Sequence, residues 1–401
     1  MSTSIADSSA HSRIKTFATE VDAPAFVVDE RAVAAKLDLS DRLRGACGCS
    51  VLYTLKPLVF EFLLEIMKPR LEGFAASSLF EAKSARGVLG DSGSVHITTP
   101  GFRADEIAEI DQLCDYIAFN SLSQLDRFGG SLSSRSKTGL RINPQLALIA
   151  DDRYNPCRKH SKLGAPLDEL ERELKTDPGL LNAIRGVHFH TNWDSQTYQP
   201  LLKTVRRIDR RLPGLIDRLE WFNLGGGYRL ESPEGYGALA EAVSLLRDRG
   251  IDDVFIEPGT AFARELGFYV AEVIDLFASG GKTVAVLDTT INHFPECFEY
   301  QYKPVVLGDD DRESNEYVLA GSSCLAGDVF GRYRFAEPLG VGSRLVFPNA
   351  GSYSIVKSHM FNGINLPTIY SIADDDRLIE RRRFTYHDFA SRFGAAEPAQ
   401  V

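Results

Sequence analysis

Residues 50–76, SVLYTLKPLVFEFLLEIMKPRLEGFAA, hold the pattern that decides the fold. The apolar run SVLYTL at 50–55 is typical of a buried strand, and EGFAA at 72–76 is a second one. Between them, PLVFEFLLEIMK at 57–68 is predicted as a helix that starts with Pro57, because proline favours the first helical turn. A strand, a helix and a second strand in this order indicate a parallel β–α–β unit.

The same alternation of strand-like and helical segments continues up to Pro258. The predicted strands are 50–55, 72–76, 94–98, 115–119, 138–142, 185–190, 220–224 and 253–257. Eight such units over about 210 residues predict a (β/α)8 barrel, the TIM barrel. Periodicity alone leaves an open, doubly wound sheet as the main alternative.

The pattern changes after Arg264, where apolar runs follow one another without long helices between them. These runs are 267–276, 282–288, 316–320 and 343–347, and 24–29 is a further one near the start of the chain. They predict a C-terminal antiparallel β domain that is completed by the N-terminal strand. The expected domains are a disordered tail at 1–21, the barrel at 31–265, and the β domain at 22–30 and 266–401.

Composition excludes several classes of protein. Of 401 residues, 44% are apolar and 25% are charged, which argues against a disordered, collagen-like or coiled-coil chain. A net charge of −10 argues against a nucleic-acid-binding surface. No apolar run approaches the roughly 18 residues of a membrane-spanning helix. Six cysteines without a signal peptide predict reduced thiols in the cytoplasm, and the lone pair Cys47 and Cys49 does not predict a metal site.

Reactive side chains gather where the predicted strands end. Active sites of such barrels lie at the carboxyl ends of the strands. The residues at those ends are Lys56, Arg141, His188, His190, Gly225, Gly226, Gly227 and Glu257. A lysine at the barrel mouth becomes a nucleophile if burial lowers the pKa of its amine, although an isolated lysine is more often an exposed helix-start residue.

The three glycines strengthen the case for a cofactor. Consecutive glycines after a strand expose backbone N–H groups that can approach a phosphate closely. Pyridoxal phosphate needs such a phosphate site, a lysine that forms a Schiff base, a group against its ring and an acid beside its pyridine nitrogen. Lys56, His190 and Glu257 complete that set, so we expect pyridoxal phosphate as the cofactor.

Several motifs resemble those of the fold-type III pyridoxal-phosphate decarboxylases, and most of all the carboxynorspermidine decarboxylase family. They are FAASSLFE at 74–81, GLRINP at 139–144, YNPC at 154–157, SKLG at 161–164, GVHFHT at 186–191, NLGGG at 223–227, EPG at 257–259, DTTINHFPECFEYQYKP at 288–304, SSCLAGDV at 322–329 and NAGSYSIVKSHMFNGINLP at 349–367. The resemblance covers about Pro24 to Pro367 and implies an alanine racemase-like barrel with an added β domain.

The resemblance also implies roles for the cofactor site. Lys56 would carry the cofactor as a Schiff base, His190 would stack on its ring, and Glu257 would pair with the pyridine nitrogen. The phosphate would be held by Gly225, Gly226, Gly227 and Tyr353. An ionised carboxylate beside the ring nitrogen keeps that nitrogen protonated, which supports the role of Glu257.

Further implied roles concern a second subunit and the substrate. Cys324 would come from the partner subunit of a homodimer with shared active sites and would protonate the α-carbon after loss of CO2. A free cysteine is by itself more often a buried apolar residue. The expected substrate-binding residues are Arg141, His293, Glu296, Glu299 and Asp328.

The chain departs from the family pattern in three places, one of which is Thr260, where the family has a glutamate after EPG. Where the family has Thr-x-Cys-Glu, this chain has Thr191-Asn192-Trp193-Asp194, and Tyr228 and Arg229 replace two histidines after the glycines. An arginine near the mouth could pair with a distal carboxylate of a substrate, or it could point outward.

These observations predict a decarboxylase of an amino-acid substrate with an extended tail, similar to carboxynorspermidine or carboxyspermidine, in polyamine biosynthesis. The alternatives are a decarboxylase of another amino acid in a specialised pathway, an amino-acid racemase, and a non-catalytic pyridoxal-phosphate-binding barrel. Glu257 argues against a racemase, because alanine-racemase-like enzymes place an arginine beside the ring nitrogen. The β domain argues against the single-barrel module.

Overall fold

The computed structural model describes residues 8–133 and 135–394. Within these ranges the chain divides into two compact units. The barrel unit is Val33–Phe262, and the sheet unit comprises the residues up to Ala32 together with those from Ala263 on. The predicted boundaries, after residues 30 and 265, differ from this division by two and three residues.

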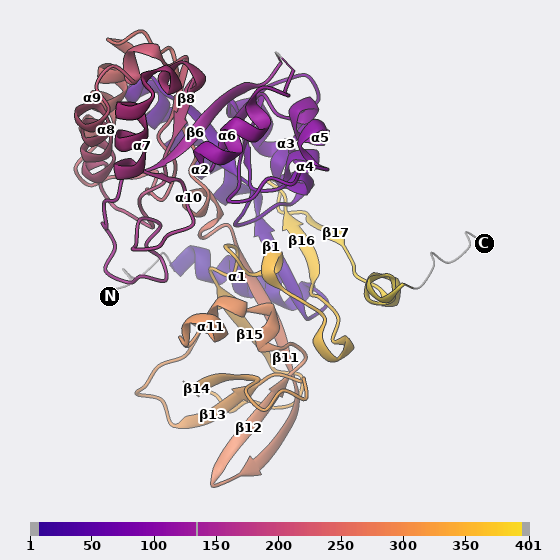
Figure 1. Cartoon of the computed structure of the whole chain (residues 1–401). Helices are drawn as coiled ribbons and strands as arrows, with labels where there is room; N and C mark the ends of the chain where they lie inside the picture. Colours follow the sequence, from indigo (N-terminus) through magenta and orange to yellow (C-terminus); the bar gives the residue numbers. More distant parts are fainter. Residues whose placement is uncertain (1–7, 134, 395–401) are drawn as a thin grey trace. The chain divides into compact units, whose positions relative to one another are not determined.

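Eight parallel strands close into a ring in the barrel unit (Figure 1). Their order is β2-β3-β4-β5-β6-β8-β9-β10, and β10 pairs with β2. The strands are β2 Ser50–Thr54, β3 Gly73–Ala76, β4 Ser94–Thr98, β5 Tyr116–Phe119, β6 Lys137–Asn143, β8 Gly186–His188, β9 Trp221–Asn223 and β10 Asp253–Ile256. A short strand, β7 (Ala165–Pro166), pairs with β6 outside the ring. The predicted barrel is confirmed, and the open-sheet alternative is wrong.

Helices follow the strands around the outside of the barrel. They are α2 Glu30–Cys47, α3 Glu61–Met67, α4 Leu79–Leu89, α5 Ile107–Leu113, α6 Leu122–Gly129, α7 Leu167–Thr176, α8 Gln199–Arg211, α9 Gly237–Arg247 and α10 Thr260–Ala263. Helix α8, which lies beside α9 in Figure 1, buries Leu201, Leu202, Val205 and Ile208, as expected for an amphipathic surface helix. Among the described residues, no helix combines the length and hydropathy of a membrane span.

The helix predicted at 57–68 begins later, at Glu61. The N–H of Leu58 donates to the carbonyl of Leu55, and the Tyr53 hydroxyl donates to the carbonyl of Leu58 at 2.7 Å. Because these bonds fix a turn after β2, Pro57 lies in that turn and not in the first turn of the helix.

A single indole fills much of the barrel interior. Trp221 is 1% exposed and packs with Tyr116 and Phe255 in an apolar cluster. A Cβ on Gly186 would lie 1.9 Å from Trp221 Cε2, so the absence of a side chain at Gly186 makes room for the ring. Interiors packed this tightly fix the positions of the strand ends above them.

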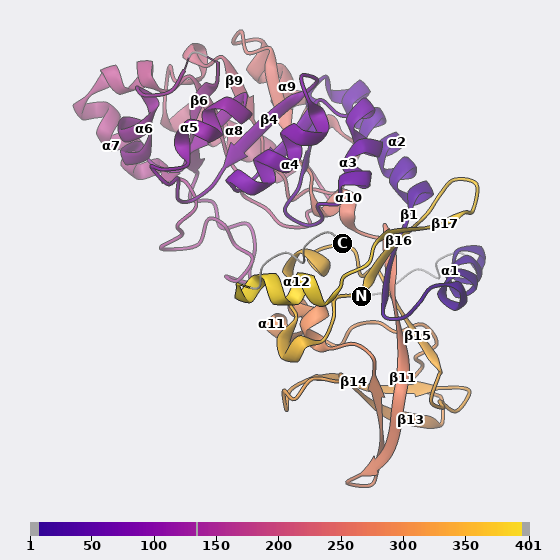
Figure 2. The ribbon, with the colours of Figure 1, turned by 90° about the vertical axis from the view of Figure 1, so that its right-hand side faces the viewer.

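A mixed sheet forms the core of the sheet unit. Its strands are β1 Ala25–Asp29, β11 Gly267–Ser279, β12 Lys282–Leu287, β13 Asn315–Ala320, β14 Val329–Phe335, β15 Arg344–Pro348, β16 Thr368–Ile372 and β17 Leu378–Arg382. Figure 2 shows β11 as the long strand that pairs with β1 and β15 in its first half and with β12 in its second. The prediction that the N-terminal strand completes this domain is confirmed, but the β1–β16 and β12–β13 pairs are parallel, so the sheet is not antiparallel throughout.

The start of the described chain is a helix and not the predicted disordered tail. Helix α1 spans Ser8–Glu20, and residues 1–7 lie outside the described residues. Phe17, Ala18 and Val21 are buried in the core of the sheet unit, in one cluster with residues of β1, β11, β15 and β16. Apolar side chains on one face of an otherwise polar helix supply the burial that orders this segment. The remaining α-helices of this unit are α11 Pro295–Tyr300 and α12 Tyr386–Ala390.

Candidate active site

The carboxyl ends of the barrel strands bring together the side chains predicted for the cofactor. Lys56 follows β2 and Arg141 lies near the end of β6. His190 follows β8, the three glycines of the loop 225–227 follow β9, and Glu257 follows β10 directly. Because β8, β9 and β10 are neighbours in the ring, the histidine, the glycine loop and the carboxylate lie next to one another.

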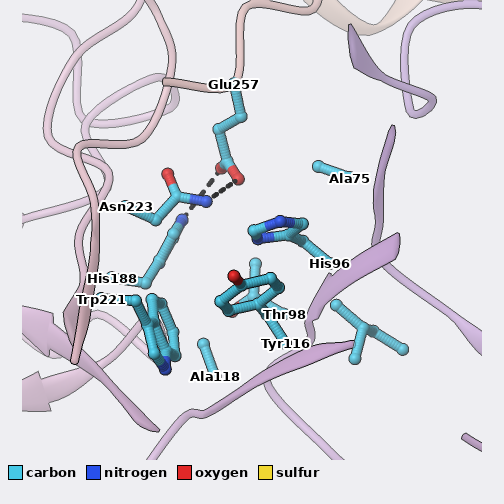
Figure 3. A pocket seen from close by; sticks show the side chains of 10 residues that line it. Ala75, His96, Thr98, Tyr116, Ala118, His188, Trp221, Asn223 and Glu257 are labelled. Atoms are coloured by element: carbon cyan, nitrogen blue, oxygen red, sulfur yellow. Dashed lines mark hydrogen bonds and ion pairs between the residues drawn. The ribbon is translucent and has the colours of Figure 1, made fainter. Parts of the chain in front are cut away.

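Glu257 is a buried carboxylate held by two side chains (Figure 3). His188 Nε2 lies 2.9 Å from one of its oxygens, and Asn223 Nδ2 donates to the other at 3.0 Å. Burial alone would raise the pKa of Glu257, but His188 and the hydrogen bond from Asn223 outweigh it and lower the pKa from 4.5 to about 2. Glu257 is therefore an ionised carboxylate in a buried place, as the partner of a protonated ring nitrogen must be.

The glycine loop 225–227 follows β9 in a conformation that excludes other residues. Gly225 and Gly227 have φ angles of 71° and 87°. A Cβ on Gly227 would lie 2.0 Å from the carbonyl oxygen of Asn192. The N–H of Gly225 donates to Asn223 Oδ1 at 2.9 Å, whereas the N–H groups of Gly227 and Tyr228 donate to no acceptor among the described residues. These two N–H groups are available to a phosphate.

His190 is a neutral imidazole with a fixed orientation. Its Nδ1 accepts a hydrogen bond from the N–H of Gly226 at 3.2 Å, which leaves the ring proton on Nε2. Burial and the positive charges of Lys56 and Arg141 lower the pKa of His190 to about 3. A flat, uncharged ring in this position can pack against the face of an aromatic cofactor.

Two cations lie around this neutral ring. Lys56 is exposed, whereas Arg141 is 7% exposed and has no hydrogen bond or ion pair among the described residues. Burial lowers the pKa of the Arg141 guanidinium, although the charge of Glu257 opposes this. A buried guanidinium without a partner is costly, so the arrangement favours an anionic ligand beside Arg141.

The residues of the barrel mouth fit pyridoxal phosphate. Gly227 and Tyr228 offer N–H groups for the phosphate, His190 a flat ring, and Glu257 an ionised carboxylate for the pyridine nitrogen. Lys56 supplies an amine that solvent can reach. Each requirement of that cofactor is therefore met by a group in the barrel unit.

The proton donor predicted from the resemblance lies in the sheet unit. Cys324 is exposed in the connection between β13 and β14, and its N–H donates to Asn362 Oδ1 at 2.8 Å. Asp328, which is 3% exposed, accepts hydrogen bonds from the N–H of Ile291 at 2.6 Å, from the N–H of Ser323 at 3.0 Å and from the Ser323 hydroxyl. Asp328 thus holds the loop that carries Cys324, which favours a structural role over the predicted contact with substrate.

His293 is likewise enclosed by the sheet unit. It is 1% exposed, and its Nδ1 lies 2.9 Å from the Thr289 hydroxyl and 3.1 Å from the Tyr269 hydroxyl. Burial and the charge of His359 lower its pKa to about 3. These contacts also favour a structural role over the predicted contact with substrate.

The other predicted residues of the sheet unit are more accessible. Glu296 and Glu299 lie on α11, and both carboxylates contact Lys357, at 3.7 Å for Glu296 and closer for Glu299. Tyr353 is half-buried and has a φ of 57°, in the left-handed region that a non-glycine residue adopts only when its surroundings hold it there.

His188 and Asn223 are the functional residues that the sequence analysis missed. His188 was placed at a strand end without a role, and Asn223 stands in the NLGGG motif, yet both hydrogen-bond Glu257. The alternation of side chains along β8 and β9 could have identified them. It directs His188 and Asn223 into the barrel interior, where the neighbouring strand β10 ends beside Glu257.

Two of the departures from the family pattern contact each other, whereas the third, Thr260, begins α10. Arg229 forms a bidentate ion pair with Asp194, with Nε–Oδ1 and Nη2–Oδ2 distances of 3.0 and 3.1 Å. The N–H of Ser195 also donates to the carbonyl of Gly227 at 2.8 Å. Arg229 therefore ties the loop after β8 to the glycine loop.

Comparisons with known proteins agree with this site. Residues 25–351 match the family model described as pyridoxal-dependent decarboxylase, C-terminal sheet domain. The chain is 34% identical over 383 residues to carboxyaminopropylagmatine decarboxylase of Synechocystis sp., covering 94% of this chain and 96% of that one. It is 32% identical over 393 residues to carboxynorspermidine/carboxyspermidine decarboxylase of Campylobacter jejuni, covering 94% and 100%.

A solved structure is similar over nearly its whole length as well. The crystal structure of carboxynorspermidine decarboxylase from Campylobacter jejuni, complexed with norspermidine, superposes with a TM-score of 0.81 at 30% identity and covers 93% of this chain and 100% of that one. The family model matches most of the chain, and relatives at 32–34% identity cover 94% of it, so the chain belongs to the pyridoxal-dependent decarboxylase family.

Proposed function

We propose that this enzyme decarboxylates a carboxylated polyamine such as carboxynorspermidine, carboxyspermidine or carboxyaminopropylagmatine. The observation that carries the proposal is the buried, ionised Glu257 beside the N–H groups of Gly227 and Tyr228, which are available to a phosphate. Relatives and a solved structure with these substrates in their names match nearly the whole chain, which supports a substrate of this class. The enzyme would thus act in polyamine biosynthesis.

The residues of the barrel, together with Tyr353, have separate roles in binding the cofactor and the substrate and in stabilising charge. Bound pyridoxal phosphate supplies the electron sink for the carbon that loses CO2. Lys56 holds the cofactor through its amine, and the Gly225–Gly227 loop with Tyr353 holds the phosphate. His190 packs on the ring through its neutral imidazole, and Glu257 keeps a proton on the ring nitrogen. Arg141 offers its unpartnered guanidinium to an anionic oxygen of the substrate.

Cys324 acts as the acid that returns a proton to the α-carbon. Its place on an exposed loop suits a group that enters the active site of a second copy of the chain. Asp328 and Asn362 hold that loop by hydrogen bonds, so the thiol is presented on a fixed backbone. The enzyme is therefore a homodimer with shared active sites in this proposal.

Acidic side chains of the sheet unit bind the cationic tail of the substrate. Glu296 and Glu299 both contact the ammonium of Lys357, and a substrate amine would replace Lys357 as their counter-ion. Burial raises the pKa of Glu296, so a cation beside it would also be favoured for keeping that carboxylate ionised. His293 and Asp328 support this region from within.

The cysteines support a cytoplasmic location. All six are free, and five of them are buried. Burial raises the pKa of Cys49 to about 12 and that of Cys297 to about 11, so these thiols stay protonated and unreactive. A chain with this many free thiols suits a reducing compartment.

A substrate panel tests the proposal. The purified holoenzyme is incubated with carboxynorspermidine, carboxyspermidine, carboxyaminopropylagmatine, diaminopimelate, ornithine and lysine, and CO2 release is measured. We expect kcat/KM for at least one of the first three to exceed that for the other amino acids by 100-fold or more. Faster turnover of diaminopimelate, ornithine or lysine would replace the proposed substrate class. Exchange of the α-proton without CO2 release would indicate a racemase.

A further inference from the structure

Two side chains hold Glu257, and one of them also joins it to the glycine loop 225–227. Glu257 accepts hydrogen bonds from His188 and Asn223 (Figure 3). Asn223 in turn accepts one from the N–H of Gly225 in the glycine loop 225–227. We propose that Asn223 and His188 are positioning residues that join Glu257 to this loop and hold both in the geometry that the cofactor requires. The inference rests on the family's cofactor and not on the proposed substrate.

Asn223 uses both ends of its amide for this connection. Its Nδ2–H donates to Glu257 at 3.0 Å, and its Oδ1 accepts from the N–H of Gly225 at 2.9 Å. An ionised carboxylate can only accept and a backbone N–H can only donate, so a flipped amide would lose both bonds. The chemistry of the two neighbours therefore fixes the orientation of Asn223.

A backbone hydrogen bond adds a second link between Gly225 and Glu257. The N–H of Glu257 donates to the carbonyl of Gly225 at 3.0 Å. Gly225 is thus linked to Glu257 in two ways. Its carbonyl accepts directly from the N–H of Glu257, and its own N–H donates to Asn223, which donates to the Glu257 carboxylate. Because pyridoxal phosphate is a rigid ring with a short phosphate arm, a fixed separation between these groups prepares the site for it.

His188 holds the other oxygen of Glu257. The carboxylate must accept, so the ring proton of His188 lies on Nε2. Its Nδ1 has no partner among the described residues and lines a small cavity in the barrel interior, together with the similarly unpartnered Thr98 Oγ1 and Trp221 Nε1. Among the residues that line this cavity, Glu257 is the only carboxylate beside His188.

Variants at both positions test the proposal on the cofactor itself. Asn223→Ala removes the bridge to Gly225, and His188→Leu removes one donor to Glu257. We expect the Kd for pyridoxal phosphate to rise about tenfold or more in each variant, since a hydrogen bond to a charged group is lost. The 15N resonance of cofactor labelled at the ring nitrogen should move toward the unprotonated value, and more so in His188→Leu than in His188→Gln, which keeps an N–H donor.

The controls separate positioning from a general loss of structure. Far-UV circular dichroism and thermal unfolding of each variant, with and without cofactor, show whether it folds. If His188→Leu or Asn223→Ala does not fold, His188→Gln and Asn223→Ser carry the same measurements. A Kd within twofold of wild type together with an unchanged 15N resonance in the folded variants would overturn the proposal. Failure of every polyamine substrate would leave these measurements, and the inference, untouched.

Discussion

Glu257 of the barrel unit and Asp328 of the sheet unit are both buried carboxylates, but their hydrogen-bond donors differ. Glu257 accepts from the side chains of His188 and Asn223, whereas Asp328 accepts from the backbone N–H groups of Ile291 and Ser323 and from the Ser323 hydroxyl. The hydrogen bonds of Asp328 therefore hold the backbone of a loop in place, whereas those of Glu257 hold the Glu257 carboxylate itself in place. In this chain, the carboxylate with a proposed chemical role is oriented by neighbouring side chains, whereas the carboxylate with a structural role orients the backbone around it.

The reactive groups that these carboxylates serve differ in the same way. Around Glu257, the Gly225–Gly227 loop and His190 form a rigid and largely buried site. Cys324, on the loop held by Asp328, is exposed. A carboxylate that must stay ionised benefits from preorganised, buried donors, whereas the role proposed for Cys324, a proton donor to a second subunit, requires an accessible thiol. The predictions below test each side of this contrast.

Replacing Lys56 should have the largest effect on activity. Lys56→Ala removes the only amine proposed to bind the cofactor covalently, so turnover should fall on the order of 10⁴-fold or more. The visible absorbance of the bound cofactor should disappear at the same time. Lys203→Ala, at an exposed lysine of α8, is the matched control and should retain both. Full turnover and a retained absorbance band in Lys56→Ala would show that another residue has this role.

Glu257→Gln should have the next largest effect, because it keeps the shape of the side chain but removes the charge. We expect kcat to fall by about 10²- to 10³-fold, as for other preorganised electrostatic groups. The exposed Glu241→Gln is the matched control and should behave as wild type. Equal kcat values for Glu257→Gln and wild type would remove Glu257 from the mechanism.

The same substitution should also change how stability depends on pH. The folded-state pKa of Glu257 is lowered from 4.5 to about 2, so its contribution to stability is complete above pH 4.5 and is lost as the pH falls toward 2. Between about pH 5 and pH 3, the Tm of wild type should therefore fall more than the Tm of Glu257→Gln. Parallel curves for the two proteins would contradict an ionised carboxylate at this position.

Cys324→Ala should have a smaller effect than Glu257→Gln, because water can replace an exposed acid. We expect kcat to fall by about 10- to 100-fold, at the low end of general acid catalysis. Mixing Lys56→Ala with Cys324→Ala tests the shared site. A mixed dimer would contain one site with both Lys56 and Cys324, so activity should exceed the sum of the separate variants. No gain after subunit exchange would show that Cys324 acts within its own chain or not at all.

Local patterns in the sequence were sufficient for the strands and the glycine loop, but not for pairings between distant segments. SVLYTL at 50–55 and NLGGG at 223–227 carry their structure in their own residues. The contact of His188 with Glu257 joins residues 69 positions apart, and it exists only because β8, β9 and β10 become neighbours. Asp328 was predicted beside the substrate from the family resemblance, and its hydrogen bond with the N–H of Ile291 could not be predicted because it depends on the folded loop.

Helix α1 shows a second reason for missed predictions. The serines among residues 1–21 favoured a disordered tail, and the apolar stripe of Phe17, Ala18 and Val21 covers little more than one turn. A stripe this short stabilises a helix only when a partner surface buries it. That surface comes from strands β1, β11, β15 and β16, and more than 200 residues separate β1 from the other three in sequence.

Arg229→Met should have the smallest effect. The guanidinium already has Asp194 as a bidentate partner, and both side chains are partly exposed, so the ion pair contributes little to stability. We expect the Tm to fall by less than about 4 °C and KM for a polyamine substrate to stay within about threefold of wild type. Asp194→Asn should behave similarly, because either change breaks the same pair. A KM that rises more than tenfold in Arg229→Met alone, and only for a substrate with a second carboxylate, would show that Arg229 leaves Asp194 to bind substrate. In that case the arginine, and not the acidic side chains of the sheet unit, would select the distal end of the substrate.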